Sequence, residues 1–118
     1  MWEVEYTDQF GAWWRELDDN QQERVAAAVE IIEQGGPAVG RPLVDTLEGS
    51  RHANMKELRV GNLRALFAFD PTRRAVLLLG GDKTRRWREW YSQAVPLADR
   101  LYDEHLRRLV EEGLIDDD

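Results

Sequence analysis

The chain has no cysteine, only two histidines and no apolar run long enough to cross a membrane. The absence of cysteine excludes disulfide scaffolds, thiolate zinc sites and cysteine nucleophiles. The longest apolar runs, such as residues 75–79, are far shorter than the about 20 residues of a membrane-spanning helix. The first residues also lack the basic and apolar parts of a signal peptide. We therefore expect a protein of the cytoplasm without a membrane partner.

The two histidines do not suggest a metal site. His52 and His105 lie far apart in the sequence, and neither has carboxylates at the spacing of a metal centre. A chain of 118 residues with 42% apolar side chains suits one domain with a modest core. We expect that domain to cover the whole chain, with residues 112–118 disordered.

Charge is distributed unevenly along the chain. Residues 51–91 hold ten Lys or Arg residues and four acidic residues, a net charge of +6, whereas the whole chain carries −7. A basic segment in an acidic protein can still bind a polyanion, because the attraction is local and is screened beyond about 8 Å at physiological salt. The segment therefore predicts a nucleic-acid-binding face.

Hydrophobic periodicity predicts a strand and two helices in the first third of the chain. Apolar and acidic side chains alternate over residues 2–6, as in a half-buried strand. Thr7 is placed as the N-cap of a short amphipathic helix. Asn20 and Glu23 resemble the capping box of a second helix, which ends at a glycine pair. Residues 37–54 show no clear period and are expected to form a mobile loop.

Three strands and a final helix are predicted for the remainder. The strands are residues 55–60, 63–69 and 75–80, and the helix begins at Trp87 or Tyr91 and ends at Glu112. The third strand is apolar on both faces, which places it in the middle of a sheet. The order β-α-α-β-β-β-α predicts an α+β fold, with a helical hairpin on a small, mostly antiparallel sheet and a C-terminal helix.

The Gly61-Asn62 pair is a two-residue hairpin signal. Such a turn places Arg59 opposite Arg64, with Glu57 on the same face. Like charges on directly opposed residues are destabilising, so two arginines there need an anion or abundant water. Two interpretations remain open. The pair clamps a phosphate with its planar guanidinium groups, or it lies on a solvated outer face where Glu57 reduces the repulsion.

Residues 80–91 favour the phosphate interpretation. They include two glycines that permit close backbone approach, together with four cations and three aromatic rings. Basic residues interleaved with aromatic side chains are typical of nucleic-acid binding, because the rings can stack on bases. The alternative is that Trp87, Trp90 and Tyr91 pack the final helix against the sheet.

The layout and several motifs resemble the RelE/ParE toxin superfamily, in particular its HigB-like, phage-derived branch. The motifs are Lys56-Glu57-Leu58-Arg59 and residues 63–71, 77–84 and 91–95, and the resemblance covers residues 2–101. It implies a RelE-like fold and a toxin of a type II toxin-antitoxin pair. It also implies a ribosome-dependent endoribonuclease without metal or organic cofactor, in which the 2′-hydroxyl of mRNA attacks the adjacent phosphate.

The resemblance implies roles for individual residues. Arg64 matches the arginine that contacts the scissile phosphate, and Tyr91 matches the tyrosine near the cut site. Lys83, Arg85 and Arg86 are alternatives for a further catalytic arginine. The predicted catalytic residues are Arg64, Lys83, Arg86 and Tyr91, and the predicted RNA-binding residues are Lys56, Arg59, Arg85, Trp87 and Arg88.

The chain departs from the family pattern at the general base. Met55 and Glu57 stand where RelE has lysines, and the histidines of HigB sites have no counterpart. Glu57 is one candidate base, since alternation puts it on the face of the two arginines. Two other functions stay open: a ParE-like inhibitor of DNA gyrase without hydrolytic activity, or a degenerate member that only binds its antitoxin and regulates the operon.

The resemblance also implies partners. These are the ribosome with its mRNA and a small helix-turn-helix antitoxin. The antitoxin is expected to cover either the basic face or the helix that carries Trp13 and Trp14.

Overall fold

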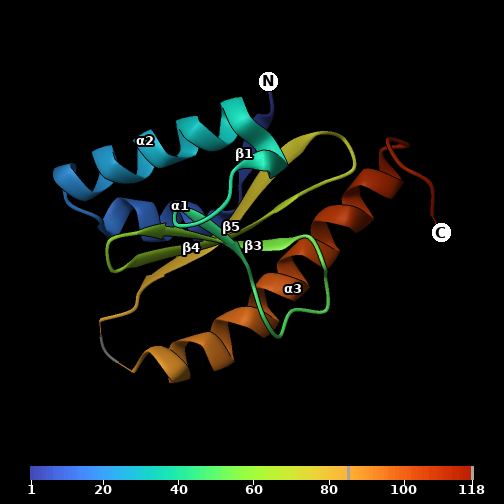
Figure 1. The fold of residues 1–118 in the computed structure, drawn as a ribbon. Helices are drawn as coiled ribbons and strands as arrows, with labels where there is room; N and C mark the ends of the chain where they lie inside the picture. The colour runs from blue at the N-terminus through green and yellow to red at the C-terminus, as the bar shows by residue number, and fades with distance from the viewer. Residues whose placement is uncertain (85, 118) are drawn as a thin grey trace.

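The computed structural model describes residues 1–84 and 86–117, which form a five-stranded sheet between two layers of helix (Figure 1). In chain order the elements are β1 (Glu3–Tyr6), α1 (Asp8–Glu16), α2 (Asp19–Gly35), the 3-10 helix η1 (Gly36–Ala38), β2 (Val44–Thr46), β3 (Met55–Val60), β4 (Leu63–Phe69), β5 (Arg74–Asp82) and α3 (Trp87–Glu111). The strand order is β1-β5-β4-β3-β2, and only the β1–β5 pair is parallel. The predicted α+β class is confirmed.

Both N-terminal helices are preceded by a residue whose side chain caps the helix N-terminus. Thr7 Oγ1 accepts a hydrogen bond from the N–H of Phe10 at 3.0 Å, as the sequence predicted. The prediction of Asn20 as the second cap is wrong, because Asp18 caps α2 and Gln21 completes the capping box. The aspartate precedes Asn20 and, as a carboxylate, makes a charge-assisted bond to the helix N-terminus, which leaves Asn20 inside the helix.

The expected loop over residues 37–54 contains regular structure, so that prediction is wrong. It holds η1 and also β2, which pairs antiparallel with β3 so that Asp45 lies opposite Glu57. A strand of three residues is too short to show a period of two in the sequence. Its presence matters for the site, because it extends the sheet beside β3.

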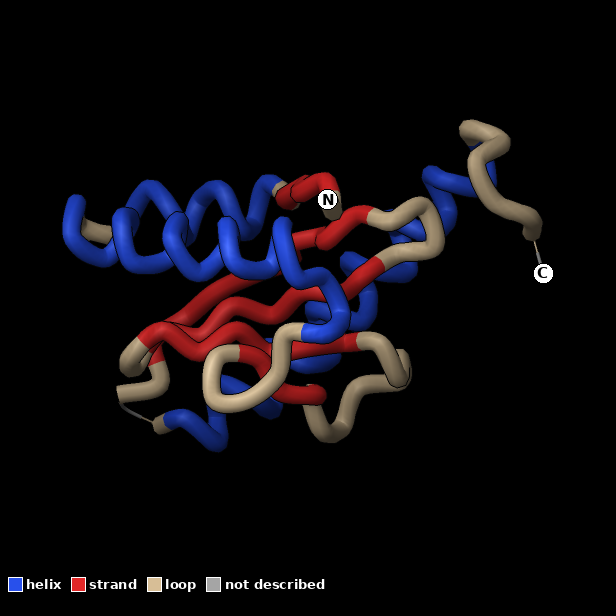
Figure 2. The backbone as a smooth tube through the Cα atoms, turned by 45° about the horizontal axis from the view of Figure 1, so that its top comes forward, coloured by secondary structure: helices blue, strands red, loops and turns tan. Residues whose placement is uncertain are grey.

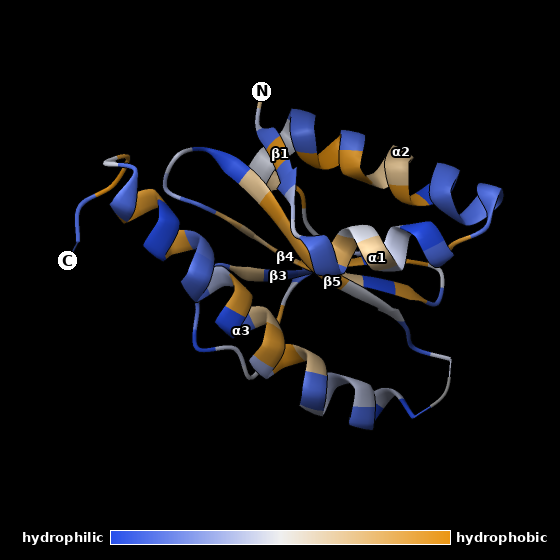
Figure 3. Ribbon diagram, turned by 180° about the vertical axis from the view of Figure 1, so that it is seen from behind, coloured by the Kyte–Doolittle hydropathy of each residue, from blue (hydrophilic) through white to orange (hydrophobic). Residues whose placement is uncertain are grey.

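Two apolar clusters lie on the two faces of the sheet. One joins β3, β4 and β5 to α1 and α2, and the other joins the same strands to α3. Figure 2 shows the strands between these helical layers. All seven residues of β4 are buried. Thus β4, not β5, is the central strand, although β5 is also interior and its hydrophobic stretch lies between the layers in Figure 3.

Two tryptophans from opposite layers pack on consecutive glycines of β5. A Cβ at Gly80 would lie 2.3 Å from the ring of Trp13, and a Cβ at Gly81 would lie 2.2 Å from Nε1 of Trp90. The close approach expected at these glycines is therefore made by indole rings. Among the described residues, none of the helices is both long and apolar enough to cross a membrane.

Candidate functional site

The β3–β4 hairpin brings together the two arginines that the sequence singled out. The predicted register is present, with Arg59 paired to Arg64 across the Gly61-Asn62 turn. Glu57 and Arg59 lie two and four positions after Met55, and Arg64 lies two positions before Leu66. Since Met55 and Leu66 belong to the cluster beneath α3, all three charged residues lie on the α3 side of the sheet.

Glu57 is the centre of this arrangement. Its carboxylate is buried, and its Oε2 accepts a hydrogen bond from Nε of Arg59 at 3.1 Å. Its Oε1 lies 3.7 Å from Nε of Arg64 and accepts a hydrogen bond from the hydroxyl of Tyr91. One carboxylate therefore connects β3, β4 and α3, and its negative charge offsets the repulsion between the two arginines.

Arg64 is held against its own hairpin. Its Nη1 donates to the carbonyl oxygens of Gly61 at 2.7 Å and Leu63 at 2.9 Å, and the residue is only 8% exposed. Within the described part of the chain, Nε of Arg64 is a buried donor without a hydrogen-bond partner. This N–H faces Oε1 of Glu57 at 3.7 Å, so the positive charge of Arg64 supports the buried carboxylate from below.

A cleft of about 740 Å³ opens over Glu57 and Arg59. One wall is formed by residues 45–49 at and after β2, and the other by the first turns of α3 with Lys83 at the rim. Arg64 does not line this cleft. The volume lies within the range of small-ligand sites and suits part of a nucleotide chain more readily than a duplex.

Arg59 lies between two carboxylates. Besides Glu57, its Nη2 contacts Oδ2 of Asp45 at 3.3 Å. The hydrogen bond from the N–H of Thr46 lowers the pKa of Asp45, and the charges of Arg41 and Arg59 lower it further against an opposing effect of desolvation. An anion that binds Arg59 must therefore compete with two carboxylates.

The rim of the cleft combines cations with an aromatic ring. Trp87 is 45% exposed, and its ring centroid lies 5.7 Å from Nζ of Lys83 and 5.2 Å from Cζ of Arg88. All three residues line the cleft. By contrast, Arg86 is strongly exposed, pairs with Glu89 at 3.5 Å and does not line the cleft. The rim thus offers a ring for stacking between two positive charges.

Two other residues that the sequence analysis singled out, Lys56 and Trp90, are not among the described residues that line the cleft. Lys56 alternates with Glu57, so it lies on the face of α1 and α2, where its Nζ donates to Oγ1 of Thr46 at 3.1 Å. Arg85 lies outside the described residues. Trp90 packs on Gly81, so the packing interpretation holds for this tryptophan.

The sequence did not identify the acidic wall of the cleft. Asp45 and Glu48 lie on or just after β2 and line the cleft opposite α3. The signal for this strand was limited to the β-forming residues Val44 and Thr46 on either side of Asp45.

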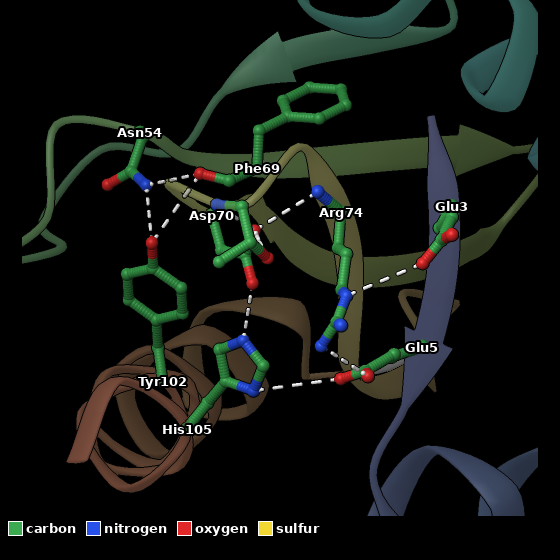
Figure 4. Close-up of polar contacts among 9 residues, drawn as sticks. Glu3, Glu5, Asn54, Phe69, Asp70, Arg74, Tyr102 and His105 are labelled. Carbon is green, nitrogen blue, oxygen red and sulfur yellow. Dashed lines mark hydrogen bonds and ion pairs between the residues drawn. The ribbon is translucent and has the colours of Figure 1, made fainter. Parts of the chain in front are cut away.

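A second polar cluster lies at the far end of β4 (Figure 4). His105 of α3 contacts Oδ2 of Asp70 at 2.6 Å, and Arg74 pairs with Glu5 at 2.9 Å. Asp70 and His105 are both buried and do not line the cleft. We assign this cluster to the attachment of α3. In the described part of the chain, no group of three or more His, Asp or Glu residues is placed to hold a metal ion.

Comparisons with known proteins give consistent results. The chain matches the family described as "Phage derived protein Gp49-like" over residues 12–103. HigB2 of Mycobacterium tuberculosis, a candidate toxin, is 49% identical over 104 residues, which are 84% of this chain and 52% of HigB2. The chain thus spans about half the length of that relative. HigB3 of the same organism, also a candidate toxin, is 46% identical over 90 residues, 75% of this chain and 79% of HigB3.

The fold itself matches solved structures. The toxin-antitoxin complex RelBE2 of M. tuberculosis contains a chain that superposes with a TM-score of 0.56 at 16% sequence identity. The match covers 69% of this chain and 96% of that chain. At this identity the likeness concerns the fold, which is RelE-like.

Proposed function

Since the chain belongs to the Gp49-like family of phage-derived proteins and has a RelE-like fold, we propose that it is the toxin of a type II toxin-antitoxin pair and cleaves mRNA on the ribosome in the cytoplasm. The observation that carries this proposal is the buried Glu57 carboxylate between Arg59, Arg64 and Tyr91, at the floor of a cleft with a cationic and aromatic rim. The description of HigB2 and HigB3 as candidate toxins supports it.

Glu57 is the proposed general base. Its carboxylate takes the proton of the 2′-hydroxyl as the 2′-oxygen bonds to the adjacent phosphorus. The bond from phosphorus to the 5′-oxygen then breaks, which leaves a 2′,3′-cyclic phosphate and a 5′-hydroxyl end. Arg59 flanks Glu57 at 3.1 Å and lines the cleft, so it stabilises the negative charge that builds on the non-bridging oxygens. Arg64 lies 3.7 Å from Glu57 below the cleft and adds its positive charge from there.

The 5′-oxygen needs a proton when it leaves. Lys83 at the cleft rim is the proposed donor, because its ammonium group carries transferable protons whereas the guanidinium groups do not release theirs. Tyr91 is a positioning residue, since its hydroxyl donates to Glu57. Trp87 and Arg88 are proposed to hold the RNA at the rim, and Arg86 to contact a more distant phosphate.

The proposed partners are the ribosome with its mRNA and a small helix-turn-helix antitoxin. Solved RelE-like chains occur in complexes with antitoxins, as in RelBE2. The net charge of +6 over residues 51–91 suits the polyanionic surface of the ribosome.

Cleavage on programmed ribosomes tests the function. The purified chain is mixed with ribosomes that carry a defined mRNA, and the RNA ends are mapped and analysed for cyclic phosphate. We expect cleavage within the decoding site, little cleavage of free RNA, and loss of cleavage in Glu57→Gln. The control is Arg107→Ala, which removes an exposed arginine of α3 outside the cleft. Intact mRNA together with gyrase-linked DNA breaks would instead favour the gyrase inhibitor, and harmless expression without a partner would favour the degenerate regulator.

A modified substrate separates the proposed base from the proposed acid. Sulfur in place of the bridging 5′-oxygen at the cut site gives a leaving group that needs no protonation. We expect Lys83→Ala to cleave this substrate at nearly the wild-type rate and the normal one slowly. Glu57→Gln should stay slow on both, and rescue of Glu57→Gln by sulfur would reverse the two roles.

A further inference from the structure

A groove of about 390 Å³ lies on the face of the sheet opposite the cleft. It is enclosed by β1, α1 and α2, and its floor is apolar, with Val4, Phe10, Val29 and Leu77 among the residues that form it. Tyr6 at its edge is 68% exposed. Because β1 is an edge strand that pairs only with β5, extended chain has access to this side of the sheet. An apolar groove beside an exposed aromatic residue is typical of a protein-binding surface.

Charge restricts what the groove can bind. Glu30 and Glu33 of α2 line it together with Arg15 of α1, which leaves the lining with a net charge of −1. Neither carboxylate forms an ion pair with any described residue. Residues 1–36 hold nine acidic residues and two arginines, a net charge of −7. The groove therefore suits a segment that inserts apolar side chains and carries Lys or Arg beside them.

We propose that this groove binds a cationic, amphipathic segment of the antitoxin, a step that rests on the proposed function. In this arrangement the antitoxin holds the toxin from behind the sheet, and its bulk prevents entry into the ribosome. A second copy of the chain fits less well. Its own cationic segment, residues 51–91, lies around the cleft on the other face of the sheet. A contact between that face and the groove joins unlike faces, which tends to produce open chains of molecules.

Two pairs of matched variants test the groove, with the product of the reading frame beside this gene as the antitoxin and titration calorimetry as the readout. Glu30→Lys with Glu33→Lys reverses both rim charges. Glu16→Lys with Glu23→Lys makes the same charge change at exposed positions outside the groove. We expect the first double variant to weaken binding at least tenfold and to reduce its salt dependence, and the second to weaken it less than threefold.

The second pair of variants adds a bulky side chain without a change of charge, one inside the groove and one outside it. Ala26→Trp puts an indole into the groove, and Ala27→Trp puts one at the next exposed position of α2, outside it. Only Ala26→Trp should lose antitoxin binding, while both should unfold at the wild-type temperature. Binding that is equal in the two members of either pair would overturn the proposal, as would a homodimer of the free chain that Ala26→Trp alone dissociates.

The ribosome assay keeps this proposal separate from the proposed function. All four variants, the two in the groove and their two controls, should cleave mRNA at the wild-type rate when no antitoxin is present, because the groove and the cleft lie on opposite faces. If the antitoxin binds through the groove but the wild-type chain cleaves nothing, the nuclease fails and the groove stands. If the chain cleaves but the groove variants bind normally, the groove fails and the nuclease stands.

Discussion

The hydroxyl of Tyr91 donates a hydrogen bond to Oε1 of Glu57, which joins the first turns of α3 to β3 at the floor of the cleft. The two residues are 34 positions apart in the sequence. Their contact explains how a helix at the end of the chain orients a carboxylate in the middle of the sheet. It also makes the geometry of the proposed base depend on the docking of α3.

Tyr91→Phe is expected to slow cleavage about 10- to 150-fold, because a hydrogen bond to a charged group contributes roughly 1.5–3 kcal/mol. The loss should appear in the rate constant of cleavage measured in single-turnover assays on the ribosome. The thermal unfolding midpoint should change little. Ser92→Ala is the control, since Ser92 also lines the cleft but its hydroxyl donates to the carbonyl of Glu89. Equal rates for wild type and Tyr91→Phe would remove Tyr91 from the proposed site.

Arg64→Ala is expected to reduce stability as well as activity. The side chain donates to the carbonyls of Gly61 and Leu63 at the hairpin turn, so its loss leaves partly buried acceptors unpaired. We expect a decrease of about 1–3 kcal/mol in the free energy of unfolding, measured by urea denaturation. An unchanged unfolding curve would show that the turn does not depend on these two bonds.

Sequence reasoning was most successful where local chemistry determines geometry. The Gly61-Asn62 turn set the register of the hairpin, so the opposition of Arg59 and Arg64 followed from turn length alone. The N-cap at Thr7 also followed from a local hydrogen bond. Both predictions depend on residues within a few positions of one another.

Features that depend on distant contacts were not predictable in the same way. Strand β2 is too short to have a pattern of its own and exists through pairing with β3. The burial of Glu57 depends on Arg59, Arg64 and Tyr91 together, and no single segment contains that information. Charge clustering located the basic rim, but it could not show that carboxylates form the facing wall of the cleft.

Gly81→Ala is expected to destabilise the protein through the contact with Trp90. Its Cβ would lie 2.2 Å from Nε1 of Trp90, so the indole or the strand must move. Overpacking of this kind typically costs about 1–3 kcal/mol. Gly40→Ala is the control, because nothing lies within 4 Å of a Cβ there. Differential scanning calorimetry should show a lower unfolding temperature for Gly81→Ala only.

Acid is expected to weaken the attachment of α3 through Asp70. Burial acts to raise the pKa of this carboxyl, but hydrogen bonds from His105, Thr72 and the N–H of Arg74 outweigh it and hold the pKa below 3.8. Since the folded state binds the proton less tightly than the unfolded state, the stabilisation is complete above about pH 5 and is lost as the pH falls through the folded-state pKa.

Asp70→Asn tests this pH dependence by urea denaturation at several pH values. The variant should be less stable than wild type at pH 7, and the difference should shrink as the pH falls below about 4. A difference that stays constant down to about pH 2 would assign the effect of Asp70 to packing rather than to its charge.

Trp87→Ala is expected to weaken mRNA binding on the ribosome more than it slows the chemical step. The ring is exposed between Lys83 and Arg88 and takes no part in proton transfer itself, although the ammonium of Lys83 lies 5.7 Å from its centroid, so its main contribution is stacking on a base. Stacking contributes about 1–3 kcal/mol per base, which corresponds to an increase in KM of roughly 5- to 150-fold. Trp87→Phe keeps a ring and should recover most of the affinity, whereas Trp87→Leu should not, because leucine supplies apolar area without a π face. If leucine restores KM as well as phenylalanine does, Trp87 acts by covering the cleft rather than by stacking on RNA.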